Sequence, residues 1–130
     1  MLGRKVGKDV QERYRADQEL AATYHDRVDA ASGAEEALRH GQAAGLADPQ
    51  LRALSVALDK ALTAALLAAQ ASERVVMGPK TYPGDDPRSA AIAARKARAT
   101  SAVQSWTDEV DRLRTAKEAN LLGFRAVARV

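Results

Sequence analysis

The clearest pattern of apolar and polar positions runs from Pro49 to Val76 and is helical. At 100° per residue, leucines recur along one side of this segment and alanines along the side beside it. Together the two apolar sides cover about 220° of the helix, twice the stripe of about 100° expected when a helix packs on one side only. The sequence therefore predicts a central helix buried between two neighbours. Its apolar positions are Leu51, Leu54, Leu58, Leu62 and Leu66 on one side and Ala57, Ala61, Ala64, Ala68 and Ala71 on the other.

A second helical pattern precedes the central helix, from about Gly7 to His40. Its apolar residues recur at alternating steps of four and three residues, which is the spacing of a packed seam. Gly33 is the expected position of a kink or break, because glycine costs about 1 kcal/mol in a helix interior. Gly41, directly after His40, fits a C-terminal cap. The seam positions are Val10, Tyr14, Ala21, Tyr24, Val28, Ala31 and Leu38.

A third helix is expected from Pro87 to about Leu122, with Gly123 as its cap. Its seam has the same heptad spacing, and Trp106, the only tryptophan, is expected to be the largest core residue. Asp48-Pro49 and Asp86-Pro87 each combine an N-cap residue with a proline suited to the first turn, so both pairs predict helix starts. The seam positions are Ile92, Ala99, Val103, Trp106, Val110 and Leu113.

Two prolines and two glycines make residues 77–86 an irregular loop. Its aromatic residue, Tyr82, either anchors the loop on the bundle or docks on a partner, and anchoring is the favoured interpretation. Residues 1–6 form a basic N-terminal arm. Residues 124–130 form an extended tail that lies along the bundle or adds an edge strand to a partner. The predicted fold is thus all-α, an elongated antiparallel three-helix bundle in one domain, residues 1–130.

The composition adds three constraints to this picture. Aromatic residues make up only 4% of the chain, so there is little large side-chain area to bury, and a partner subunit is expected to supply more. No cysteine is present, which excludes disulfides, thiolate metal sites and cysteine nucleophiles. No apolar run has the length of a signal peptide's core or of a membrane span. We therefore expect a soluble protein, cytoplasmic or virion-associated, with no membrane partner.

The net charge of +3 is distributed unevenly. Residues 1–15 carry five Lys/Arg and two Asp/Glu, whereas residues 16–50 carry two and seven. The best basic patch lies early in the third expected helix, where three arginines fall within about 80° of one face. This patch is an ordinary solvated face, a phosphate contact, or a contact with the acidic stretch of a neighbouring copy. It consists of Arg88, Arg95, Lys96 and Arg98.

No motif of catalysis or of metal or cofactor binding stands out. His25, Asp29, Glu36 and His40 share a helical face within about 60°, and imidazole and carboxylate are metal ligands. However, His25 and Glu36 would stand about 16 Å apart along one helix, so a solvated polar face is favoured. Lys80 lacks the glycine spacing of a phosphate-binding loop. The sequence therefore predicts a non-enzyme without a metal, a cofactor or a small-molecule substrate.

Two functions of different classes follow. The first is a structural or adaptor protein, a helical subunit of a homo-oligomer or a multi-protein assembly such as a phage head-to-tail connector. The second is a nucleic-acid-associated accessory protein that binds through the basic patch and through Arg4, Lys5 and Lys8. For the first function, the expected partner-binding residues are Tyr82, Phe124, Arg125, Val127 and Arg129.

Overall fold

The computed structural model describes residues 6–128, and the side chains of residues 6–124. These residues are all-helical, with no strand among them, which confirms the predicted fold class. The prediction of three helices is wrong, because both outer helices are broken. The elements are α1 (Lys8–Ala21), α2 (Tyr24–Ala43), α3 (Asp48–Met77), the short 3₁₀ helix η1 (Pro79–Thr81), α4 (Pro87–Arg98) and α5 (Ser101–Ala128).

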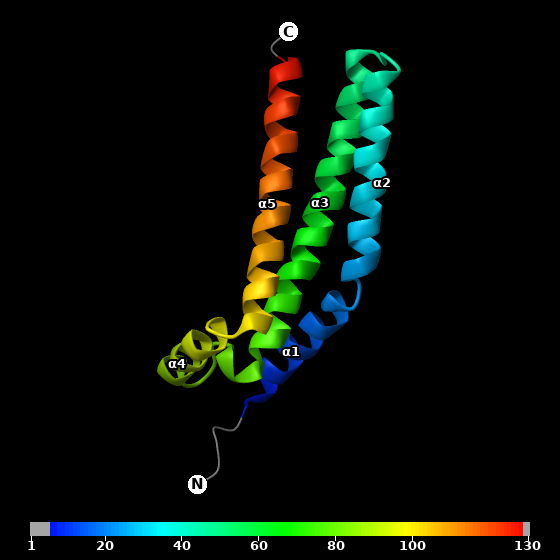
Figure 1. Cartoon of the computed structure of the whole chain (residues 1–130). Helices are drawn as coiled ribbons and strands as arrows, with labels where there is room; N and C mark the ends of the chain where they lie inside the picture. Colours follow the sequence, from blue (N-terminus) through cyan, green and yellow to red (C-terminus); the bar gives the residue numbers. More distant parts are fainter. Residues whose placement is uncertain (1–5, 129–130) are drawn as a thin grey trace.

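The long helices form an elongated bundle in which α3 lies between α2 and α5 (Figure 1). Both α2 and α5 run antiparallel to α3, while α1 packs on the C-terminal end of α3 and α4 lies beside that end. The central position predicted for residues 49–76 is therefore confirmed. At this lower end of the bundle, α1, α3, η1, α4 and α5 all meet.

The core follows the alanine and leucine sides of α3. Leu58 and Leu62 are buried there, and they pack with Ala31 of α2 and with Val110 and Leu113 of α5. Four alanines of α3 have no exposed surface at all, so neighbouring backbones can approach closely. These alanines are Ala65, Ala68, Ala69 and Ala71.

The N-terminal helix breaks at Ala22–Thr23, and the predicted break at Gly33 is wrong. The Thr23 hydroxyl donates a hydrogen bond to the carbonyl oxygen of Leu20 at 2.6 Å, so it satisfies a carbonyl at the end of α1. Gly33 is a helical residue within α2, and it is exposed to solvent. Packing of Ala31 and Leu38 against the core holds α2 straight through Gly33. The break lets α1 turn onto the lower end of α3.

The C-terminal helix breaks at Ala99–Thr100. The Thr100 hydroxyl donates to the carbonyl oxygen of Ala97 at 2.7 Å and accepts from the backbone N–H of Val103 at 3.4 Å. Thr100 thus closes α4 and caps the N-terminus of α5. As a result α4 leaves the seam, and Ile92, predicted to be buried, is 48% exposed.

The rest of the predicted seam of α5 is largely correct. Val103, Val110 and Leu113 are buried, and Leu113 and Val103 are the largest of the fully buried side chains among the described residues. Trp106 packs against the core but is only partly buried, so the prediction that it is the largest core residue is correct only in part. Its ring instead stands edge-on to Tyr24 of α2, with centroids 4.9 Å apart.

The predicted caps are correct in part. The carboxylate of Asp86 accepts from the N–H of Ser89 at 3.1 Å, as expected of an N-cap. Asp48 is the first residue of α3, and the cap position is Ala47, whose N–H donates to the Gln50 side chain at 3.2 Å. Gly41 is not a cap. It is buried in the last turn of α2, next to the leucines at the start of α3.

The predicted extended tail is wrong for residues 124–128. Helix α5 continues through Gly123 to Ala128, because Gly123 does not adopt the left-handed conformation that would end the helix. The side chains of Arg125 and Val127 lie outside the described residues. So do Arg129 and residues 1–5, which include Arg4 and Lys5 of the predicted basic arm.

Candidate functional site

The outer side of α4 carries a cluster of cations around an exposed apolar side chain. Ala90 and Ala94 are the buried residues of α4 and hold it on the bundle. On the opposite side, Ile92 is 48% exposed, and the helix contains no acidic residue. Arg88, Arg95 and Lys96 lie within about 60° of Ile92 around the helix, and Arg98 lies on the flank toward α5. We call these four cations the basic face, and all are exposed.

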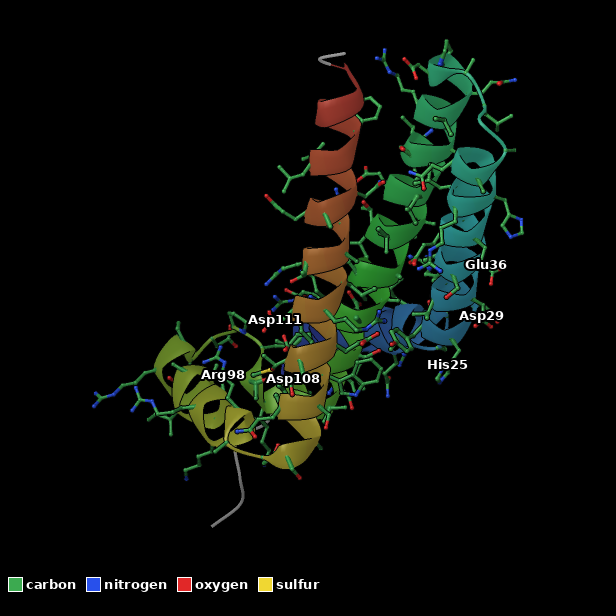
Figure 2. All side chains as sticks on the ribbon, turned by 45° about the horizontal axis from the view of Figure 1, so that its top comes forward. His25, Asp29, Glu36, Arg98, Asp108 and Asp111 are labelled. Carbon is green, nitrogen blue, oxygen red and sulfur yellow. The ribbon has the colours of Figure 1, made fainter. Side chains whose placement is uncertain are left out.

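The outer side of α2 carries the opposite charge. Asp26, Asp29 and Glu36 are exposed and fall within about 80° of one another around the helix, and we call them the acidic face. Asp29, Glu36 and His25 point away from the bundle (Figure 2). No group of three potential metal ligands comes together anywhere in the described part of the chain. The arrangement therefore offers a charged surface for a partner.

Tyr82 anchors the loop before α4. Its side chain is buried, its ring stands edge-on to Tyr14 with centroids 5.9 Å apart, and its hydroxyl donates to the carboxylate of Asp17. Arg74 of α3 donates to the same carboxylate through Nε at 2.9 Å and Nη2 at 2.8 Å. Tyr82 therefore anchors the loop on the bundle, the favoured one of its two interpretations.

The three anchoring groups shift one another's pKa values. The hydrogen bonds from Arg74 and then Tyr82 lower the pKa of Asp17, although partial burial opposes the shift. Burial, followed by the hydrogen bond to Asp17, raises the pKa of Tyr82. Both groups therefore keep the charge states that the hydrogen bonds need at neutral pH. This cluster joins α1, α3 and the loop.

A second polar cluster joins α2 to α5. The Tyr24 hydroxyl donates to the carboxylate of Glu109, and Arg112 donates to the same carboxylate through Nε and Nη2, each at 2.7 Å. The hydrogen bond from Arg112 is the main cause of a lowered pKa of Glu109. Every member has a partner within the bundle, so the cluster is structural.

A cavity opens where α1, α3, the loop, α4 and α5 meet. It has a volume of about 870 Å³, and arginines from four helices line it. We call it the arginine cleft, after Arg13, Arg74, Arg98 and Arg114. Thr107 and Gln70 add polar groups, and Met77, Ala94 and Val110 add apolar surface.

A smaller groove of about 420 Å³ lies between the upper halves of α2, α3 and α5. Leucines of α2 and α3 line it together with Phe124 of α5. The Phe124 ring lies 5.4 Å from the guanidinium of Arg52 on α3, a cation–π distance. Phe124, predicted to contact a partner, thus contacts its own chain.

Comparisons with protein-family models, with curated proteins and with solved structures found no match to this chain. None of the helices in residues 6–128 combines the length and the apolar character of a membrane-spanning helix.

Sequence reasoning found the basic face but missed the arginine cleft. The four arginines lie between positions 13 and 114 and share no motif. Only the breaks at Thr23 and Thr100 bring α1 and α4 to the same end of α3. The sole available signal was the pair of threonines at the breaks, since threonine often ends or caps a helix.

Proposed function

We propose that this chain is a non-enzymatic structural or adaptor subunit that assembles with further copies of itself, or with other protein subunits. In the self-assembly, the basic face of one copy docks on the acidic face of the next. The observation that carries the proposal is Ile92, 48% exposed among four cations on a helix without acidic residues. An apolar anchor within a charged rim is the usual anatomy of a protein interface.

The positions of the two faces favour a head-to-tail contact. Helix α4 and the outer side of α2 lie on opposite sides of the bundle in both views (Figures 1 and 2). A copy therefore cannot pair its own two faces, and a contact between different surfaces repeats from copy to copy. Repetition of this kind gives a ring when the rotation closes and a filament when it does not. A connector-type ring is one assembly of this class.

The test is the native mass, measured by light scattering after gel filtration at low and high salt. We expect a mass of several copies at low salt that decreases at high salt, because ions screen contacts between exposed charges. The double variant R95E/K96E and the double variant D29K/E36K should each be monomeric alone. R95E/K96E keeps the acidic face, and D29K/E36K keeps the basic face. When mixed, the two variants should assemble again, because the acidic face of one attracts the basic face of the other. A monomer at both salt concentrations, or a mixture that stays monomeric, contradicts the proposal.

The second candidate function is a nucleic-acid-associated accessory protein. It is supported by the same basic face, since the four cations of residues 87–98 can contact several phosphates. Lys8, the first residue of α1, is exposed and could add a further contact. The test is a salt titration of binding to duplex DNA. Affinity should fall steeply with salt and should be lost in R95E/K96E, while salt-independent binding would exclude this function.

A further inference from the structure

The arginine cleft holds two cations without a partner. Arg98 of α4 and Arg114 of α5 line the cleft, and neither forms an ion pair or a hydrogen bond with another described residue. Arg13 also lines the cleft, and it donates one hydrogen bond to the carbonyl oxygen of Pro83, a neutral acceptor. Cations that line one open cavity raise the local positive potential and attract an anion.

The carboxylates of the cleft compensate these cations only in part. Asp17 is already bound by Arg74 and Tyr82, and Glu73 accepts from the Thr107 hydroxyl at 2.7 Å. Thr107 is neutral, so Glu73 keeps its charge, and Asp111 of α5 is a second carboxylate of the cleft without an ion pair among the described residues (Figure 2). These two carboxylates and the guanidinium groups of Arg13, Arg98 and Arg114 line the same cleft, which leaves it with a net positive charge.

We propose that the arginine cleft binds a small organic phosphate monoester, with Arg98 and Arg114 as its main phosphate ligands and Arg13 as a third. The planar guanidinium group donates two parallel hydrogen bonds to phosphate oxygens, so arginine suits this role better than lysine. The apolar wall of Met77, Ala94 and Val110 receives the organic part. The cleft's volume of about 870 Å³ falls within the range of small-molecule sites, about 300–1,000 Å³.

This site shares Arg98 with the basic face of the proposed assembly. Arg114 lies on α5 and is no part of the basic face, so its replacement leaves the charges of the assembly contact unchanged. The ligand is bound and released, and no chemical step is assigned to it. Loss of phosphate binding and loss of assembly can therefore be observed separately.

The test is isothermal titration calorimetry of the full chain with inorganic phosphate and with phenyl phosphate, at constant ionic strength set with chloride. We expect both ligands to bind, and phenyl phosphate to bind more tightly because its ring contacts the apolar wall. R98Q and R114Q should each weaken binding about tenfold, as expected when a hydrogen bond between charged groups is lost. D111N should bind several-fold more tightly, because it removes one of the two competing carboxylates. The control is K60Q, which removes an exposed cation of α3 away from the cleft.

Circular dichroism and melting temperature should show that R98Q and R114Q fold like the parent chain. The proposal is overturned if neither ligand gives heat beyond that of chloride, or if R114Q binds like K60Q. A phosphate monoester can also be part of a phosphorylated protein. A phosphotyrosine peptide of about ten residues is therefore titrated in parallel, and much tighter binding of the peptide than of phenyl phosphate would overturn the assignment to a small molecule.

Discussion

The Tyr82 hydroxyl donates a hydrogen bond to the Asp17 carboxylate, which joins two residues 65 positions apart. The bond ties the loop before α4 to α1, and Arg74 ties the same carboxylate to α3. Together these hydrogen bonds fix two walls of the arginine cleft and the direction in which α4 leaves the bundle.

Replacing Tyr82 by phenylalanine should therefore lower the free energy of unfolding by about 1–2 kcal/mol, because a hydrogen bond to a charged, partly buried group is lost. Tyr82→Ala should cost more, about 3 kcal/mol, since the buried ring is lost as well. The measurement is urea denaturation followed by circular dichroism at high salt. The matched control is Tyr14→Phe, because the Tyr14 hydroxyl has no hydrogen bond with the described residues. Equal effects of Tyr82→Phe and Tyr14→Phe would contradict the anchoring role.

The lowered pKa of Asp17 predicts a dependence of stability on pH. The ordinary pKa is 3.8, and the folded chain has a lower value because Arg74 and Tyr82 stabilise the charged form. The stability that Asp17 contributes is therefore fully present above pH 3.8 and is lost as the pH falls through the folded-state pKa. The free energy of unfolding of the parent chain should fall more steeply below about pH 4 than that of Asp17→Asn. Parallel curves for the two proteins would exclude this contribution.

The two glycines of α2 should respond in opposite directions to replacement by alanine. Gly33 is exposed with no atom near the position of an added Cβ, so Gly33→Ala should stabilise the chain by about 0.5–1 kcal/mol. An added Cβ at Gly41 would lie 2.8 Å from Leu54 Cδ1 and 3.0 Å from Leu46 Cδ1. Overpacking should therefore outweigh the helix propensity, and Gly41→Ala should destabilise by about 1 kcal/mol.

Urea denaturation of the two glycine variants under one set of conditions checks this prediction. If Gly41→Ala were as stabilising as Gly33→Ala, then the contact of the last turn of α2 with the start of α3 would be looser than described.

Because the helix breaks at Thr100, replacements at two residues of the predicted seam should differ in their effect on stability. Leu113 is buried, and Leu113→Ala should lower the free energy of unfolding by about 2–5 kcal/mol. Ile92 is exposed, so Ile92→Ser should change the stability of the monomer by no more than about 0.5 kcal/mol. The same Ile92→Ser variant should weaken the proposed assembly. A large loss of monomer stability in Ile92→Ser would instead indicate one continuous helix from residue 87.

Much of the fold follows from the sequence alone, because local rules decide it. The periodicity of residues 49–76 depends on the 3.6-residue turn, so the central helix and its buried sides could be predicted. The cap at Asp86 needs only a side chain that reaches an N–H three residues away. The basic face could be predicted too, since it lies on a single helix. These features involve neighbours in sequence.

Tertiary packing decided the rest. A threonine can continue a helix or end one. At Thr23 and Thr100 the ends are favoured because α1 then packs against the lower end of α3, and α4 packs against η1 beside that end. A glycine can break a helix, yet Gly33 does not, because Ala31 and Leu38 on either side are held by the core. Three features depend on these helix ends: Tyr82 is buried, Ile92 is exposed, and Arg98 and Arg114 line the same cleft. They bring together residues far apart in the chain, where no spacing rule applies.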